Sequence, residues 1–351
     1  MKNYVVLFLF INFSVFSQNR NEINKIIGTY NTSELNNIKT SIIESNNQKQ
    51  SRVNNYLLLN ASKQESFVVN GVMYKMIDVI DNKPLYISTD NRNSALAVKT
   101  NNLYPGGNLG LNLTGAGMNI GVWDGGWALT THEEFLNAGV SRITTPDAQT
   151  INPAAEFHAT HVVGTIGASG ININARGMAY ESNIKSYNWT SDNTEVISEA
   201  ANYGLLISNH SYGIPINSDD GSQSAPDWMM GNYNTDASQW DQISFNAPYY
   251  LEVTSAGNSG MDTYSNGLAP GLDKLTGEKN AKNNLVVANA NPTVNPITGA
   301  ITNLVINGSS SQGPSDDGRI KPDITADGTN VLSTIETSTT SYGTATGTSM
   351  S

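Results

Sequence analysis

From about residue 110 onward, short apolar runs alternate with stretches in which apolar residues recur at helical spacing. The apolar runs predict six strands: Met118–Asp124, Ile184–Trp189, Leu205–Asn209, Tyr249–Ser255, Asn284–Ala290 and Thr302–Ile306. The stretches between them predict three helices: Glu156–Ala168, Asn193–Tyr203 and Asp236–Asn246. This alternation is typical of an α/β fold with a mainly parallel sheet covered by helices. Ligand sites in such sheets gather beyond the carboxyl ends of the strands.

The residues before this part have a different pattern. Asn19 to Arg52 is polar with Ile and Leu at roughly helical spacing, whereas Ser66 to Ile87 is strand-like, with Asn70-Gly71 as a hairpin turn. A polar linker is expected near Asp90–Asn102. We therefore predict a small N-terminal region over residues 18–100 and a larger domain over 101–351.

The first 17 residues predict a secretory signal peptide. One early Lys is followed by a mostly apolar run from Tyr4 to Phe16 and by the small Ser17. A membrane anchor is the alternative, but the run is shorter than the ~20 residues that span a bilayer. We expect an exported protein, periplasmic, cell-surface or extracellular, without stable membrane insertion after the signal is removed.

Composition excludes several classes of function. The 351 residues contain no cysteine, which excludes disulfides, thiolate metal sites and a cysteine nucleophile. The formal net charge of -11 argues against sequence-independent nucleic-acid binding, because that binding requires a positive field. A hydrophobic content of 38% is enough to fill a core.

Four segments carry candidate chemistry. A carboxylate ends the first predicted strand, at Asp124, and enters a glycine turn. His158 and His161 lie near the start of the first predicted helix, Asn258 follows the strand that ends at Ser255, and Ser349 lies in Gly347-Thr348-Ser349-Met350. Taken singly, each is explained equally well as a cap, a turn, a surface or a metal-binding residue. Their conjunction in one chain is what requires an explanation.

Together these segments resemble the signature blocks of the subtilisin-like serine proteases (subtilases, peptidase family S8). Asp124, His158 and Ser349 stand in the chain order Asp, His, Ser of that family. Further blocks agree with it: Asn209-His210-Ser211-Tyr212-Gly213, Ser309-Ser310-Ser311-Gln312-Gly313-Pro314 and Asp317-Gly318-Arg319-Ile320-Lys321-Pro322-Asp323-Ile324. The resemblance covers about residues 115–351. It implies a three-layer subtilisin-like fold and peptide-bond hydrolysis.

The resemblance also implies a role for each site residue. Ser349 would be the nucleophile, His158 the general base, and Asp124 the group that orients and stabilises the imidazole. A serine hydroxyl needs such a base because it is a weak nucleophile at neutral pH. Asn258 would donate to the oxyanion together with the backbone N–H of Ser349. His161 would be structural.

Substrate contacts follow from the same resemblance. Ser211, Tyr212 and Gly213 would pair with an extended peptide, and Ala256 and Gly257 would line the cleft. The partners implied are protein or peptide substrates. No cofactor is required for the chemistry; structural calcium is common in the family, but the sequence assigns no ligand to it. The acidic, aromatic segment 214–239 either shapes the cleft or forms a surface insertion, and we favour the insertion.

The leading hypothesis is therefore a secreted serine endopeptidase, with residues 18–100 as a pro-region and a mature amino end near residue 100. The alternative is a non-catalytic peptide-binding or surface module that retains the protease fold. The chain stops at Ser351, two residues after the predicted nucleophile, where the family continues into a helix. We expect the sequence to be a C-terminally truncated copy of a longer, active protease and to be inactive by itself.

Overall fold

A computed structural model describes residues 51–60, 63, 66–69, 72–80, 83–88, 91–150, 153–217, 221–264, 268–269, 271–295 and 298–351. The predicted signal peptide over residues 1–17 and the predicted turn Asn70-Gly71 lie outside these residues. Among the described residues, no helix is both long enough and apolar enough to cross a membrane.

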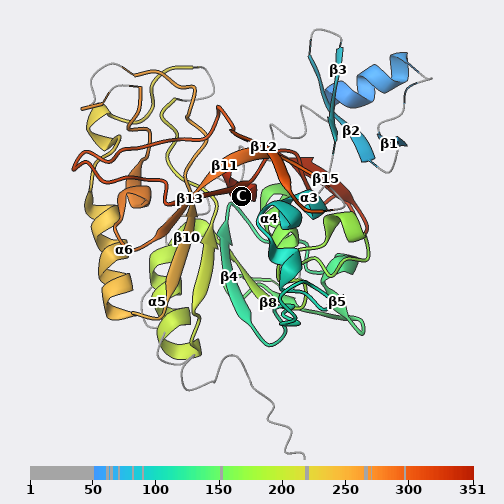
Figure 1. Cartoon of the computed structure of the whole chain (residues 1–351), viewed down its shortest axis with the longest axis horizontal. Coiled ribbons are helices and arrows are strands. Elements are labelled where there is room, and N and C mark those ends of the chain that lie inside the picture. The colour runs from blue at the N-terminus through green and yellow to red at the C-terminus, as the bar shows by residue number, and fades with distance from the viewer. Residues whose placement is uncertain are drawn as a thin grey trace, which may run out of the picture.

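An eight-stranded sheet forms the centre of the larger domain (Figure 1). Its path runs β12-β11-β10-β9-β4-β8-β7, and β13 pairs with β11 off this path. All the pairings are parallel except that of β12 with β11. The strands are β4 (Asn119–Asp124), β7 (Ile143–Thr144), β8 (Asn183–Asn188), β9 (Ile207–His210), β10 (Leu251–Ser255), β11 (Leu285–Val294), β12 (Ile301–Ile306) and β13 (Ile324–Asp327).

Helices cover both faces of this sheet because neighbouring strand residues point to opposite sides. On β4, Trp123 packs in a cluster with residues of α5 (Asp192–Tyr203) and α6 (Thr235–Asn246), whereas Val122 packs with residues of α4 (Phe157–Gly167). The result is three layers, helices on either side of one sheet. The predicted α/β class and subtilisin-like three-layer arrangement are confirmed.

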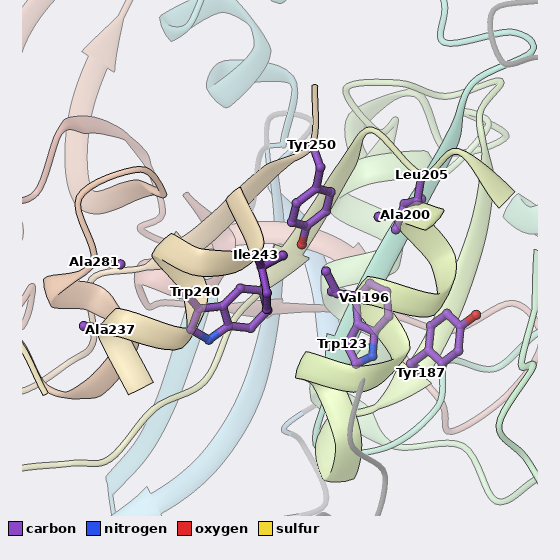
Figure 2. Packing of buried hydrophobic residues seen from close by; sticks show 10 residues of the cluster. All are labelled: Trp123, Tyr187, Val196, Ala200, Leu205, Ala237, Trp240, Ile243, Tyr250 and Ala281. Atoms are coloured by element: carbon purple, nitrogen blue, oxygen red, sulfur yellow. The ribbon is translucent and has the colours of Figure 1, made fainter. Parts of the chain in front are cut away.

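The face covered by α5 and α6 is aromatic. Figure 2 shows Trp123 and Tyr187 close together beside Val196 of α5, with Trp240 and Ile243 on α6. The rings of Trp123 and Tyr187 stack with centroids 4.5 Å apart and an interplanar angle of 4°. Aromatic side chains of this size bury ~150–250 Å² each and dominate the energetics of a core. This layer therefore anchors β4, the strand that carries Asp124.

On the opposite face, α4 packs against the antiparallel hairpin of β14 (Val331–Thr334) and β15 (Tyr342–Ala345). The helix and the hairpin can approach closely because residue 164 is glycine. A Cβ at this position would overlap Oγ1 of Thr334 and Oγ of Ser333. Both hydroxyls donate to carbonyls of α4, Ser333 to His161 at 2.7 Å and Thr334 to Thr160 at 2.8 Å. The helix that carries His158 is thus fixed to the hairpin that leads to Ser349.

Before this domain, residues 51–59 are helical and β1 (Ser66–Val69), β2 (Val72–Ile80) and β3 (Lys83–Ser88) form an antiparallel sheet. The predicted linker differs from the structure, since it contains α3 (Asn91–Ala97). Ser94 and Ala95 of α3 are buried, and Oγ of Ser94 donates to Asp327 at 2.9 Å. The remaining short elements are β5 (Leu136–Asn137), β6 (Val140–Ser141), η1 (Thr100–Asn102), η2 (Glu133–Phe135), η3 (Ile173–Ala175), η4 (Trp189–Ser191), η5 (Asp227–Met229), η6 (Gly277–Asn280) and η7 (Thr348–Met350).

Candidate active site

One cleft, with a volume of 510 Å³, lies beyond the carboxyl ends of β4, β9 and β10. Every site residue predicted from the sequence lines it: Asp124, His158, Ser211, Tyr212, Gly213, Ala256, Gly257, Asn258 and Ser349. These residues come from five segments that are far apart in the chain. The parallel sheet brings the strand ends to one edge, as expected for a site in an open α/β sheet.

The carboxylate of Asp124 and the imidazole of His158 form the central contact. Asp124 ends β4 and is 1% exposed, and its Oδ1 lies 2.7 Å from Nδ1 of His158. The same oxygen accepts the backbone N–H of Gly125 at 2.7 Å. His158 stands in the first turn of α4, and its side chain is 29% exposed toward the cleft. This contact orients the ring with Nδ1 toward Asp124 and leaves Nε2 as the nitrogen without a partner among the described residues.

The two histidines of α4 differ in charge and environment. Burial by itself lowers the pKa of His158, but the charge of Asp124, the hydrogen bond to Asp124 and the charge of Glu156 outweigh it and raise the pKa to about 9. Burial and the neighbouring His158 instead lower the pKa of His161 to about 3. His161 is fully buried and its Nε2 lies 2.9 Å from the carbonyl oxygen of Val331 in β14. It therefore holds α4 to the hairpin and does not reach the cleft.

Ser349 lies in the short helix η7, which begins directly after Gly347. Its hydroxyl donates to the carbonyl oxygen of Ser211 at 3.1 Å, and the hydroxyl of Ser211 donates to the carbonyl oxygen of Ser349 at 3.1 Å. No hydrogen bond joins Ser349 to His158 within the described part of the chain.

The side-chain oxygen of Asn258 is held by Thr348. Its Oδ1 accepts the backbone N–H of Thr348 at 3.0 Å and the hydroxyl of Thr348 at 3.2 Å. That hydroxyl accepts the N–H of Gly257 at 3.1 Å, and Gly257 has a φ of +98°, which favours glycine. Two donors, Nδ2 of Asn258 and the backbone N–H of Ser349, have no acceptor among the described residues.

Sequence reasoning missed three groups of residues at the cleft. Glu156 caps α4, and an acidic residue at the first position of the predicted helix was the signal that could have drawn attention to it. Lys279 is buried beneath Gly213, where its Nζ donates to the carbonyl oxygen of Tyr212 at 2.8 Å and pairs with Glu278. Nothing in the local sequence indicated this position for Lys279.

The start of segment 214–239 also lines the cleft. Ile214, Pro215 and Asn217 contribute to its wall, and Ile216 is buried in a separate small cluster with Ala225, Met230 and Tyr264. Trp228 is exposed. The favoured interpretation of the whole segment as a surface insertion is therefore wrong for its first residues, which pack in and shape the cleft.

The described residues contain one group whose atoms are arranged to hold a metal ion, Asp124, Glu156 and His158. Calcium takes six to eight oxygen ligands, and a set of two carboxylates and an imidazole does not supply them. This group therefore does not fit the calcium that the family resemblance implied, and we assign no calcium ligand.

One family model and several solved structures are similar to this chain. A family model described as the subtilase family, peptidase S8, matches residues 60–351. No curated protein sequence matches the chain significantly. Among solved structures, the CspB protease of Clostridium perfringens has 16% identity and a TM-score of 0.47, covering 74% of this chain and 84% of its own.

Two further structures are similar to the same extent. A cold-adapted subtilisin-like serine proteinase has 20% identity and a TM-score of 0.40, with 68% of this chain and 72% of that chain covered. A mutant of the protease domain of PatA has 18% identity and a TM-score of 0.46, with 68% and 76% covered. The family match spans most of the chain, including all the residues of the cleft. The chain belongs to the subtilase family of serine peptidases.

Proposed function

We propose that the protein is a serine endopeptidase in which Asp124, His158 and Ser349 form the catalytic triad. The observation that carries this proposal is that the three side chains line one cleft, with Asp124 and His158 in contact at 2.7 Å. Membership of the subtilase family supports peptide-bond hydrolysis as the reaction.

In this mechanism, Nε2 of His158 takes the proton from Oγ of Ser349 as that oxygen attacks the carbonyl carbon of the substrate. The imidazolium that forms is stabilised by Asp124 through Nδ1, and its proton then passes to the leaving amine. Asp124 is buried and already holds the ring by the correct nitrogen, so little reorganisation is required. A water molecule hydrolyses the acyl-enzyme by the same steps.

The oxyanion of the tetrahedral intermediate would be held by Nδ2 of Asn258 and the backbone N–H of Ser349. The geometry favours this assignment because Oδ1 of Asn258 is fixed by Thr348, which leaves the amide group of Asn258 free to donate. Donors that are positioned before the reaction cost no reorganisation when the charge develops.

The substrate would bind as an extended peptide along Ser211, Tyr212 and Gly213, opposite Ala256 and Gly257. This placement is supported by the position of Ser211–Gly213 directly after β9, where backbone groups can pair with an added strand. The chemistry proposed here requires no cofactor. Export by the signal peptide over residues 1–17 is part of the same proposal.

Replacement of Ser349 by Ala in the full-length protein tests the function. Hydrolysis of casein or of an internally quenched peptide should fall to the background rate, while the fold, followed by circular dichroism and thermal unfolding, stays unchanged. Peptide binding by the Ala variant should be retained. A protein that binds peptides equally well in both forms, with no turnover in either, would instead be the non-catalytic module.

A further inference from the structure

Glu156 is a buried carboxyl group at the cleft that the proposed mechanism does not use. It is 2% exposed and stands two residues before His158, at the start of α4. Its Oε2 accepts the backbone N–H of Ala159 at 2.7 Å. Its own backbone is held at both ends, since its N–H donates to Trp127 at 2.9 Å and its carbonyl accepts from Thr160 at 3.0 Å. The position of the carboxyl group is therefore fixed.

The carboxyl group of Glu156 lies near the Asp124–His158 pair. Oε1 of Glu156 and Oδ2 of Asp124 are both buried, and neither has a hydrogen-bond partner among the described residues. One ligand atom each from Asp124, Glu156 and His158 lies within 4.8 Å of the others. Two buried acceptors without a donor are costly, because each loses its hydration and gains no hydrogen bond in return. A single proton between them supplies the missing donor.

We propose that Glu156 keeps its proton at the pH of catalysis and donates it from Oε1 to Oδ2 of Asp124, acting as a positioning residue for the Asp124–His158 pair. This inference rests on the proposed function. It assigns to Asp124 one fixed hydrogen bond through each oxygen, Oδ1 to His158 and Oδ2 to Glu156. The carboxylate plane, and with it the imidazole ring, is then set before substrate binds.

Electrostatics favours the neutral form of Glu156. Burial, followed by the charge of Asp124, raises the pKa of the Glu156 carboxyl, and the opposing effects of His158 and of two backbone N–H groups are smaller. The titratable groups that face it are Asp124, from β4, and His158, from its own helix. The other charged groups on the cleft wall are Asp262, Lys274 and Lys279.

The neutral form also suits the base. A charged Glu156 adds to the rise in the pKa of His158, and an imidazole that stays protonated cannot accept the proton of Ser349. When Glu156 is protonated, its contribution to the pKa of His158 disappears, and Asp124 alone raises that pKa. The neutral carboxyl group of Glu156 then fixes the geometry of the Asp124–His158 pair without adding a second negative charge beside His158.

Two substitutions of Glu156 in the full-length protein separate the alternatives. Glu156→Gln mimics the protonated acid, since its amide oxygen accepts from Ala159 while its NH₂ group donates to Asp124. Glu156→Asn retains a good helix cap but is one methylene too short to reach Asp124. We expect E156Q to keep kcat/KM within about threefold of the parent. E156N should lose about tenfold, within the range for a buried charged acceptor that loses its donor.

The dependence of kcat/KM on pH decides whether Glu156 is neutral. The acid limb of kcat/KM follows the ionisation of His158. If Glu156 is neutral, E156Q should leave the pH of this limb unchanged. An ionised Glu156 predicts that E156Q moves the limb to lower pH, because a negative charge beside His158 has been removed. That shift would overturn the inference, as would an E156N variant with the parent's kcat/KM.

A second readout does not depend on turnover. The imidazole of His158 can be titrated by nuclear magnetic resonance in the Ser349→Ala protein, with and without E156Q or E156N. The same pKa in S349A and in S349A/E156Q, with a changed pKa in S349A/E156N, supports the link between Glu156 and Asp124. A pKa lowered by E156Q contradicts it. If the parent has no peptidase activity, the proposed function fails, while this titration still gives an answer on Glu156.

Discussion

The groups at the cleft that have no hydrogen-bond partner among the described residues include Nε2 of His158, Nδ2 of Asn258 and the backbone N–H of Ser349. Each belongs to a side chain or backbone whose other polar atoms are fixed by neighbours. An active site whose hydrogen bonds form only with the substrate and the transition state needs donors and acceptors that are fixed in position but unpaired. These groups define where the scissile carbonyl would bind.

The pH dependence of activity should follow His158. As a base, His158 must be neutral, so activity is lost as the pH falls through its pKa. Because Asp124 raises that pKa above the ordinary value of 6.5, despite burial, the acid limb of kcat/KM should lie above pH 6.5. Asp124→Asn should lower the limb and reduce kcat by about 10⁴-fold. A limb below pH 6 in the parent would contradict this assignment.

Asn258→Ala should reduce kcat by about 10²–10³-fold with a small change in KM, since the lost donor acts mainly in the transition state. The substitution also removes the acceptor for Thr348, so thermal unfolding should be measured alongside. Asn258→Asp is the matched control, because it keeps that acceptor but has no NH₂ group to donate. Full activity in either variant would place the oxyanion elsewhere.

At the scale of elements, much of the sheet could be predicted because apolar runs and helical periodicity are local signals. The predicted strand Met118–Asp124 differs by one residue from β4, and the predicted helix Glu156–Ala168 includes both caps of α4. The β14–β15 hairpin was missed because its residues are mainly Ser, Thr and Gly. Its stability depends on contacts with α4 that no local pattern reveals.

The site residues, too, could be predicted only where a local sequence signal marks them. Asp124, His158, Asn258 and Ser349 could be selected because their short motifs resemble those of a family. The closeness of Glu156 to Asp124 depends instead on the angle at which α4 meets β4, and the position of Lys279 beneath Gly213 depends on the packing of η6. Such contacts follow from tertiary packing, which one sequence does not specify position by position.

Gly164→Ala tests the coupling of α4 to the hairpin. The new methyl group would overlap the hydroxyls of Ser333 and Thr334, so the free energy of unfolding should fall by about 1–3 kcal/mol. Because β15 leads to Ser349, kcat/KM should fall as well. Gln242→Ala, at an exposed position of α6, is the control and should change stability by less than about 0.5 kcal/mol. Equal stability in both variants, measured by urea denaturation, would show that α4 and β14 are not tightly packed.

Glu134 fastens the loop after α4. Its carboxylate, fully buried, accepts the backbone N–H groups of Gly170, Ile171 and Asn172 and the hydroxyl of Tyr342 in β15. Glu134→Ala leaves the three backbone N–H groups without this acceptor, at a cost of about 1–3 kcal/mol for each one that stays buried, whereas Tyr342 can still donate to Glu133. Amide hydrogen exchange should accelerate over residues 169–172. The neighbouring Glu133→Gln should leave that exchange unchanged; slow exchange in the Glu134 variant would contradict the role.

At the scale of the whole molecule, the position of α3 bears on processing. The sequence predicts a mature amino end near residue 100, yet α3 precedes that point and is packed through Ser94 and Ala95. Removing it would leave Asp327 without the hydroxyl of Ser94. We therefore expect any processed form to begin before Asn91. Amino-terminal sequencing of the protein from its native source checks this, and a start at Gln18 in fully active enzyme would argue against a pro-region altogether.

The central claim is that Ser349 is a nucleophile activated by His158. The most direct test is to treat the full-length protein from its native source with a fluorophosphonate probe and to locate the label by mass spectrometry. The proposed function predicts one label, on Ser349, that is lost when His158 is replaced by Ala. A folded full-length protein that stays unlabelled, or that is labelled on another serine, would contradict it.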